Sequence, residues 1–157
     1  MAQTDPILSR LQAACARREY CESDIRAKAV KLCEEDEARA DAIVASLIKD
    51  GFVNDLRYAC AFAREKSRLN GWGPHKIRMA LRLKKIEKST IEQALEEASG
   101  HEAEEKLQKL VQAKWRSLKA DPQAKLKLLR FALGRGYEYE QVKDIVEECA
   151  KKDSGQE

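Results

Sequence analysis

Positively charged side chains are concentrated in one part of this sequence, where they could bind an anion. Residues 54–88 contain ten Lys or Arg and three Asp or Glu, a local net charge of +7, whereas the whole chain of 157 residues has a net charge of +3. The flanking segments are therefore mildly acidic. Because guanidinium groups form paired hydrogen bonds with carboxylates and phosphates, an Arg-rich surface suits an acidic protein or a nucleic acid.

On two predicted helices, these cations form stripes that are separate from the apolar positions. Arg57, Arg64 and Arg68 share one side of a helix, whereas Tyr58 and Phe62 lie on another. Three acidic residues are too few to neutralise the stripes through local pairs. We therefore take seven residues as candidate contacts to a protein partner or to DNA phosphates: Arg57, Arg64, Arg68, Lys76, Arg78, Arg82 and Lys85. The alternative is an ordinary solvated helix face.

Trp72 lies between two glycines and shortly before Pro74, in the turn that separates the two basic helices. Its ring either packs between the helices, which is the commoner role, or lies exposed as a contact residue beside the cations. The sequence leaves both interpretations open.

The sequence holds no pattern typical of a catalytic or metal site. It contains no Gly-rich phosphate loop, and no Ser or Cys has a recognisable base as its partner. The five cysteines include no Cys-x-x-Cys pair, and an odd number suits a reducing compartment, so we expect apolar thiols without a metal. We predict that the protein is not an enzyme and needs no cofactor.

The composition indicates a soluble, helical protein. Charged residues make up 36% of the chain, and seven Gly and three Pro provide few turns for a β sandwich. No run reaches the roughly 18 apolar residues of a membrane span, and the N-terminus lacks the layout of a signal peptide. We expect a cytoplasmic monomer that does not bind membranes.

Helix-start signals divide the chain into about nine helices. Asp5 and Asp121 each precede a Pro, Asn54 precedes an acidic residue, and Ser89 precedes Glu92 in a capping box. The predicted helices lie at residues 6–18, 23–34, 37–50, 54–69, 74–85, 89–99, 102–119, 122–134 and 138–151.

The apolar pattern repeats about every 51 residues. In the third helix of each set of three, the stripe recurs as Ala40, Ile43 and Val44, then Ile91, Ala94 and Leu95, then Val142, Ile145 and Val146. The second helices agree less closely and the first helices only weakly. Since one such unit cannot bury its apolar face alone, stacked units must share a core.

These patterns together predict an all-α fold of tandem three-helix repeats in an elongated, curved array. The predicted repeats are residues 1–53, 54–100 and 101–151, and residues 152–157 form a disordered tail.

Several short motifs carry a family resemblance that covers nearly the whole chain. An Asp-x-Arg-aromatic-Ala pattern begins at Asp55, Gly71-x-Gly73-Pro74 follows, and Arg-Gly-Tyr stands at residues 135–137. In these motifs the sequence resembles the RecX family, regulators of the bacterial recombinase RecA. Lys85 departs from the pattern, because the family usually has Gly there to take the left-handed conformation at a helix end. We therefore expect a different helix ending at Lys85.

The resemblance implies tandem three-helix repeats and a regulatory function without catalytic residues. RecX proteins bind along the groove of the RecA filament on single-stranded DNA, and they reduce recombination, ATP hydrolysis and co-protease activity. By this resemblance, the protein inhibits RecA and modulates DNA repair and the SOS response, with the RecA filament and single-stranded DNA as its partners.

Two other functions fit the same residues. A stand-alone DNA-binding module would use the basic segment by itself. A passive helical scaffold would keep every partner affinity unchanged after charge reversal at Arg64, Arg68, Arg78 and Arg82.

Overall fold

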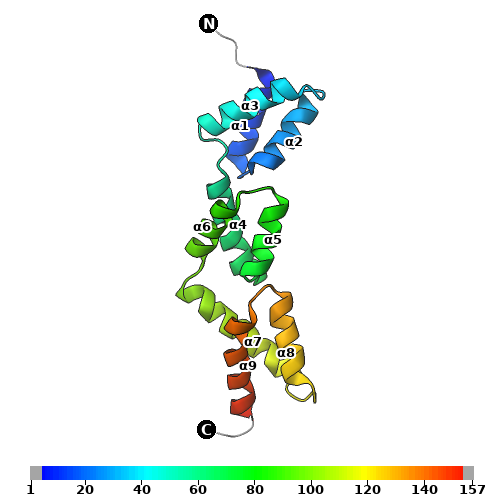
Figure 1. The fold of residues 1–157 in the computed structure, drawn as a ribbon, viewed down its shortest axis with the longest axis vertical. Helices are drawn as coiled ribbons and strands as arrows, with labels where there is room; N and C mark the ends of the chain where they lie inside the picture. Colours follow the sequence, from blue (N-terminus) through cyan, green and yellow to red (C-terminus); the bar gives the residue numbers. More distant parts are fainter. Residues whose placement is uncertain (1–4, 154–157) are drawn as a thin grey trace. The chain divides into compact units, whose positions relative to one another are not determined.

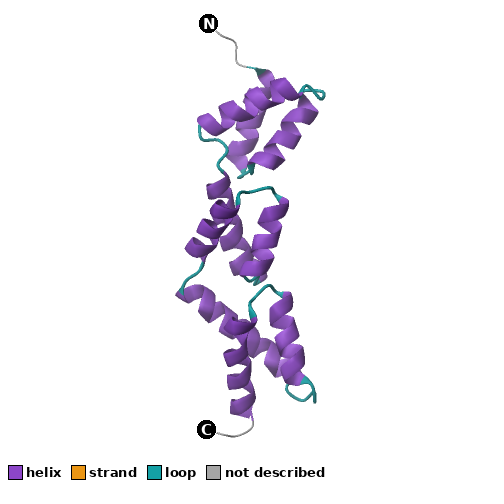
Figure 2. Ribbon diagram, viewed as in Figure 1, coloured by secondary structure: helices purple, strands orange, loops and turns teal. Residues whose placement is uncertain are grey.

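The protein is built from α-helices throughout the part that can be described. The computed structural model describes residues 5–153, apart from the side chains of residues 101 and 102. Within this range there are nine helices and no strand (Figures 1 and 2). They are α1 (Pro6–Arg17), α2 (Glu22–Leu32), α3 (Glu37–Lys49), α4 (Asp55–Asn70), α5 (Pro74–Leu83), α6 (Lys88–Ala98), α7 (His101–Leu118), α8 (Ala124–Gly134) and α9 (Tyr139–Asp153). The all-α prediction is confirmed, and each predicted helix has a counterpart.

Two of the predicted caps start helices as expected. The side chain of Asp5 accepts a hydrogen bond from the Ile7 amide at 2.8 Å, and Pro6 opens α1. Asn54 accepts from the Arg57 amide at 2.9 Å. Both side chains satisfy amides in a first turn that have no partner within the helix.

The other two predicted helix starts, at Ser89 and Asp121, differ from the structure. α6 begins at Lys88, so Ser89 lies inside the first turn and is not the cap. α8 begins at Ala124, two residues after the predicted start, and Asp121 instead caps the preceding turn by accepting from the Gln123 amide at 2.8 Å. Pro122 therefore lies in a turn, which its fixed φ also suits.

The expectation of a different helix ending at Lys85 was wrong. Lys85 itself takes the left-handed conformation, with φ of 62°. The amides of Lys85 and Ile86 then bond to the carbonyls of Arg82 and Leu81, which closes the end of α5 as a glycine would. The chain keeps the same ending and bears the steric cost of a Cβ at that position.

The 51-residue repeat is reflected in burial. In α2, α5 and α8 the equivalent apolar positions are all buried: Ile25, Ile77 and Leu128, and four residues later Ala29, Leu81 and Ala132. In the third helices the stripe is also buried except for Ile145, which is partly exposed. The first helices fit poorly, since Leu11 is buried whereas the equivalent Ala113 is exposed.

The chain forms two compact units, and the first consists of residues 5–61 and 81–94. Its core lies between α1, α2 and α3, which pack on one another (blue to cyan in Figure 1). Leu11, Ile25 and Leu47 are completely buried there. Partly buried residues such as Tyr20 and Phe52 pack against this cluster.

The second unit consists of residues 62–80 and 95–153. α7, α8 and α9 pack together around Val111, Leu128 and Val142, which are completely buried (yellow to red in Figure 1). α4, α5 and α6 each contribute residues to both units.

The proposed division into repeats at residues 53 and 100 stays a prediction. The predicted tail begins too early, because α9 continues to Asp153. The rest of that tail, residues 154–157, lies outside the described residues.

Candidate interaction surface

The seven predicted contact cations are distributed over the two units. Arg57, Arg82 and Lys85 belong to the first unit. The second unit holds the other four cations and the predicted contact aromatic: Arg64, Arg68, Lys76, Arg78 and Trp72. The prediction of a basic contact surface therefore has to be considered separately in each unit.

Arg57 is engaged inside the first unit. Its Nε donates to both carboxylate oxygens of Glu19, at 2.9 and 2.7 Å, and its Nη2 donates to the carbonyls of Gly51 and Phe52, at 3.0 and 3.2 Å. The Arg57 guanidinium thus links Glu19, just after α1, to the carbonyls of Gly51 and Phe52, just after α3. These bonds give Arg57 a role in the fold.

Asp55 and Lys84 make two further connections to the start of α2. Cys21 provides no side-chain cap there, and Asp55 instead accepts from the Glu22 amide at 2.7 Å. Lys84 donates to Asp24 at 2.8 Å, and this hydrogen bond raises the pKa of Lys84. The sequence indicated Asp55 as an acidic residue at the start of its own helix and as part of a family motif, but gave no sign of its bond to α2.

In the second unit, two glycine motifs meet backbone to backbone. The Gly73 amide donates to the Arg135 carbonyl at 2.6 Å, and the His75 amide donates to the Gly136 carbonyl at 2.9 Å. A Cβ on Gly73 would lie 2.5 Å from the Gly136 carbonyl carbon, and a Cβ on Gly136 would lie 2.4 Å from Cβ of Lys76. No other residue type fits without a backbone shift. We call this contact the glycine junction.

Two cations, one in α7 and one directly after α8, also bind the end of α4. Arg135 Nη1 donates to the Asn70 carbonyl at 2.5 Å, and Lys106 Nζ donates to the Arg68 carbonyl at 2.8 Å. These carbonyls belong to the last turn of a helix, where they have no helical partner and carry the negative end of the dipole. Both cations therefore anchor α4 to the rest of the unit.

Trp72 packs against a neighbouring ring and is also partly accessible, while its role as a contact residue stays a prediction. Its ring packs edge-on against Phe62, with centroids 6.2 Å apart, and the side chain is only partly buried. The ammonium groups of Lys66 and Lys76 lie 5.1 and 4.7 Å from its centroid, within the range of cation–π attraction.

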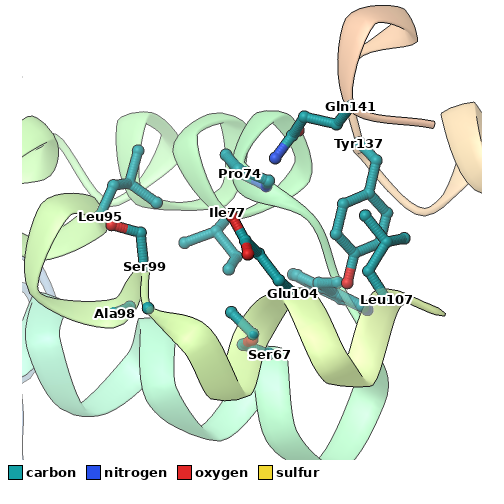
Figure 3. Close-up of a pocket in the computed structure, with 13 residues that line it drawn as sticks. Ser67, Pro74, Ile77, Leu95, Ala98, Ser99, Glu104, Leu107, Tyr137 and Gln141 are labelled. Carbon is teal, nitrogen blue, oxygen red and sulfur yellow. The ribbon is translucent and has the colours of Figure 1, made fainter. Parts of the chain in front are cut away.

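Trp72 also lines a pocket of about 380 Å³, which we call the apolar pocket. The apolar walls include Pro74, Ile77, Leu107 and Tyr137 (Figure 3). Four polar side chains also line it, namely Ser67, Ser99, Glu104 and Gln141. In Figure 3 the side chains of Glu104 and Gln141 reach toward Pro74. An apolar cleft with a few convergent polar groups is a common form of ligand site.

Beside the apolar pocket runs a hollow lined by cations, which we call the basic groove. Its two parts share Ser67, and their cationic lining residues are Arg64, Arg68, Lys106, Lys109 and Arg135. Glu97 is the one carboxylate among the lining residues of these parts. Leu69, which is 78% exposed, and Leu110 add apolar surface.

Three members of the basic groove were missed by sequence reasoning. Lys106 and Lys109 come from α7, which has four Lys or Arg against three Asp or Glu, and Arg135 follows α8. No local charge excess marks these three residues in the sequence. The fold alone brings Lys106 and Arg135 to α4, from positions about 40 and 65 residues away. The Arg-Gly-Tyr motif at residues 135–137 was the one available signal.

The described residues hold no group of three or more His, Cys, Asp or Glu side chains placed to bind a metal. All five cysteines are buried free thiols, and their burial agrees with the expectation that they are apolar residues. Burial raises the pKa of the Cys15, Cys21 and Cys149 thiols, which keeps them protonated. Among residues 5–153, no helix is long and apolar enough to cross a membrane.

Two consecutive regions of the chain match domains of a known protein family. Residues 54–95 match the family model described as "RecX, second three-helix domain", and residues 102–146 match "RecX, third three-helix domain". The chain belongs to the RecX family. The glycine junction, which joins residues from these two matched regions, is therefore a contact between two RecX domains.

Individual RecX proteins support the same assignment. The "Regulatory protein RecX" of Clostridium botulinum (strain Eklund 17B / Type B) is 32% identical over 156 residues, which cover 95% of this chain and 72% of that relative. A "Crystal structure of regulatory protein RecX" matches with a TM-score of 0.78 and 25% identity, over 88% of this chain and 69% of that one. RecX from Lactobacillus salivarius has the same fold, with a TM-score of 0.79 at 21% identity, over 92% and 97% of the two chains.

Proposed function

We propose that this protein is a non-enzymatic regulator that binds the RecA recombinase on its filament with single-stranded DNA. Binding lowers recombination, ATP hydrolysis and co-protease activity, and thereby modulates DNA repair and the SOS response in the cytoplasm. The observation that carries the proposal is the match of two consecutive regions to RecX three-helix domains.

The contacts of the cations refine which side chains would bind the partner. Arg57 bonds Glu19 and two carbonyls, which gives it a role in the fold of the first unit. Arg64 and Arg68 line the basic groove and are exposed. An exposed guanidinium can form paired bonds with carboxylates of a RecA subunit or with DNA phosphates. We therefore place the main contact of the second unit at Arg64 and Arg68, with Lys76 and Arg78 beside them on α5.

The proposal is tested by RecA ATP hydrolysis on single-stranded DNA with increasing amounts of this protein. The double charge reversal Arg64→Glu/Arg68→Glu is compared with Arg10→Glu/Arg130→Glu, which changes the net charge equally at exposed positions on α1 and α8. We expect wild type and control to inhibit alike, and the groove variant to need about tenfold more protein or more. Circular dichroism confirms that each variant is folded.

Two results would contradict the proposal. No inhibition by wild type at any ratio would remove the regulatory function. Equal inhibition by both double variants would leave a passive helical surface as the better account of these cations.

A further inference from the structure

The apolar pocket and the basic groove share walls and form one continuous surface within the second unit. Both are lined by Ser67, Ala98, Ser99, Gly100 and Ala103. A ligand that enters the pocket therefore passes directly beside Arg64, Arg68 and Lys106. We propose that this surface binds single-stranded nucleic acid, with one unpaired base in the apolar pocket and its phosphates along the basic groove.

The pocket suits a flat aromatic ring with a polar edge. At about 380 Å³ it falls within the roughly 300–1,000 Å³ range of ligand clefts. Trp72 is partly buried and provides aromatic surface, Tyr137, which is 7% exposed, lines the wall, and Pro74 and Ile77 provide apolar surface. Unpaired bases bind proteins by stacking on such side chains while their edges form hydrogen bonds.

The charges beside the pocket fit a polyanion. Lys66 and Lys76 lie against the Trp72 ring, and five cations line the groove against one carboxylate, Glu97. Grooves that bind single strands combine such cations with aromatic platforms. Lys106 and Arg135 each donate one hydrogen bond to a helix carbonyl and retain further N–H groups for a phosphate.

The polar lining favours a base over an apolar side chain of a protein partner. Glu104 and Gln141 are exposed residues that line the pocket, and an aliphatic anchor packed against them would displace water without giving them a hydrogen-bond partner, which is unfavourable. A base with an exocyclic amino group can donate to the Glu104 carboxylate, and the Gln141 amide can both donate and accept. Cytosine has that amino group, whereas thymine has a carbonyl in its place. We therefore expect the pocket to prefer cytosine to thymine.

This inference deepens the proposed function and rests on it for the biological setting, but its test needs only the isolated protein. Fluorescence anisotropy is measured with labelled dC12 and dT12 oligonucleotides over a salt series. The variant Ala103→Leu fills the shared wall of pocket and groove, and Ala113→Leu adds the same atoms at an exposed position of the same helix. We expect about tenfold weaker dC12 binding for Ala103→Leu only.

A second variant tests whether Glu104 recognises the amino group at the edge of the base. Glu104→Gln keeps the side-chain size but replaces the carboxylate by an amide, so the preference for dC12 over dT12 should shrink by severalfold.

A fluorescence experiment tests the contact of the base with Trp72. A Trp115→Phe background leaves Trp72 as the one tryptophan, and its fluorescence should be quenched by dC12 and not by inorganic phosphate.

Equal affinities of Ala103→Leu and wild type for dC12, or no quenching of Trp72, would overturn the base pocket. Binding of an acidic peptide with one apolar residue at the same site, competing with dC12 and weakened by Ala103→Leu more strongly, would overturn it in favour of a protein partner. The RecA assay is separate. A wild-type protein that inhibits RecA but does not bind dC12 contradicts this inference alone, and a wild-type protein that binds dC12 but does not inhibit RecA contradicts the proposed function alone.

Discussion

The amide of Gly73 donates a 2.6 Å hydrogen bond to the carbonyl oxygen of Arg135 and joins two loops that are 62 residues apart in the sequence. The contact brings together two motifs by which the chain resembles its family. Because the atoms in contact belong to the backbone, these motifs are explained by close approach and not by side-chain chemistry. The proposed partner contacts are therefore other residues, the exposed Arg64 and Arg68 of the basic groove.

The first prediction concerns this junction. Gly73→Ala should lower the free energy of unfolding by about 1–3 kcal/mol, since the added methyl group would overlap the Gly136 backbone. Urea unfolding followed by circular dichroism measures the change. Gly134→Ala is the control, because a Cβ there meets nothing within 4 Å. Similar stability of the two variants would show that the loops separate easily.

The second prediction concerns the end of α5. Lys85→Gly should raise the free energy of unfolding by about 1 kcal/mol, because glycine removes the strain of the left-handed conformation but increases the freedom of the unfolded chain. Lys88→Gly is the control, since Lys88 begins α6 and does not have a positive φ. A loss of stability in Lys85→Gly would mean that the lysine side chain makes a contact that outweighs the strain.

The third prediction concerns Arg57. Arg57→Ala should lower the free energy of unfolding by about 1–2 kcal/mol, because it removes an ion pair with Glu19 and bonds to two carbonyls. Arg57→Lys should recover part of this, since one ammonium group cannot reach all three partners together. Thermal or urea unfolding measures both. Arg130→Ala, on the exposed side of α8, should change stability by no more than about 0.5 kcal/mol.

The fourth prediction concerns acid stability. The hydrogen bond from Arg39, with that from the Ile7 amide, lowers the pKa of Asp5 below its ordinary value of 3.8. Since the folded protein has the lower pKa, the stabilisation is complete above pH 3.8 and is lost as the pH falls through the lower value. Wild type should therefore be more stable than Asp5→Asn at pH 6, and the difference should shrink below pH 3.8.

Asp121 provides an independent copy of the same experiment. Lys127 and the Gln123 amide lower its pKa in the same direction, so Asp121→Asn should show the same pH dependence. Unfolding curves between pH 2.5 and 6 measure both differences. A difference for Asp5→Asn that does not change with pH would show that the carboxylate charge contributes nothing there.

Much of the fold could be predicted from sequence because the signals are local. Asp5 and Asn54 cap the helices that follow them. Ile25 and the equivalent residues Ile77 and Leu128 are all buried. Ser89 misled because the preceding chain became helical one residue earlier. Lys85 misled because the fold imposes on it a conformation that its side chain disfavours.

The interaction surface was less predictable. The cations of α4 and α5 were visible as a charge excess, but the engagement of Arg57 by Glu19 depends on a contact across 38 residues. The basic groove depends on Lys106 and Arg135, and the apolar pocket on Glu104 and Gln141, which reach it only through tertiary packing. Spacing within a helix carries no information about such partners.

The division of α4, α5 and α6 between the two compact units has a practical consequence for dissecting the protein. The chain passes between the units at residues 61–62, 80–81 and 94–95, so neither unit is one continuous segment. A truncation after residue 100 would keep residues 62–80 and remove α7, α8 and α9, with which they form a unit. Fragments cut at repeat boundaries should therefore expose apolar surface and aggregate, and functions are better separated by point substitutions in the full chain.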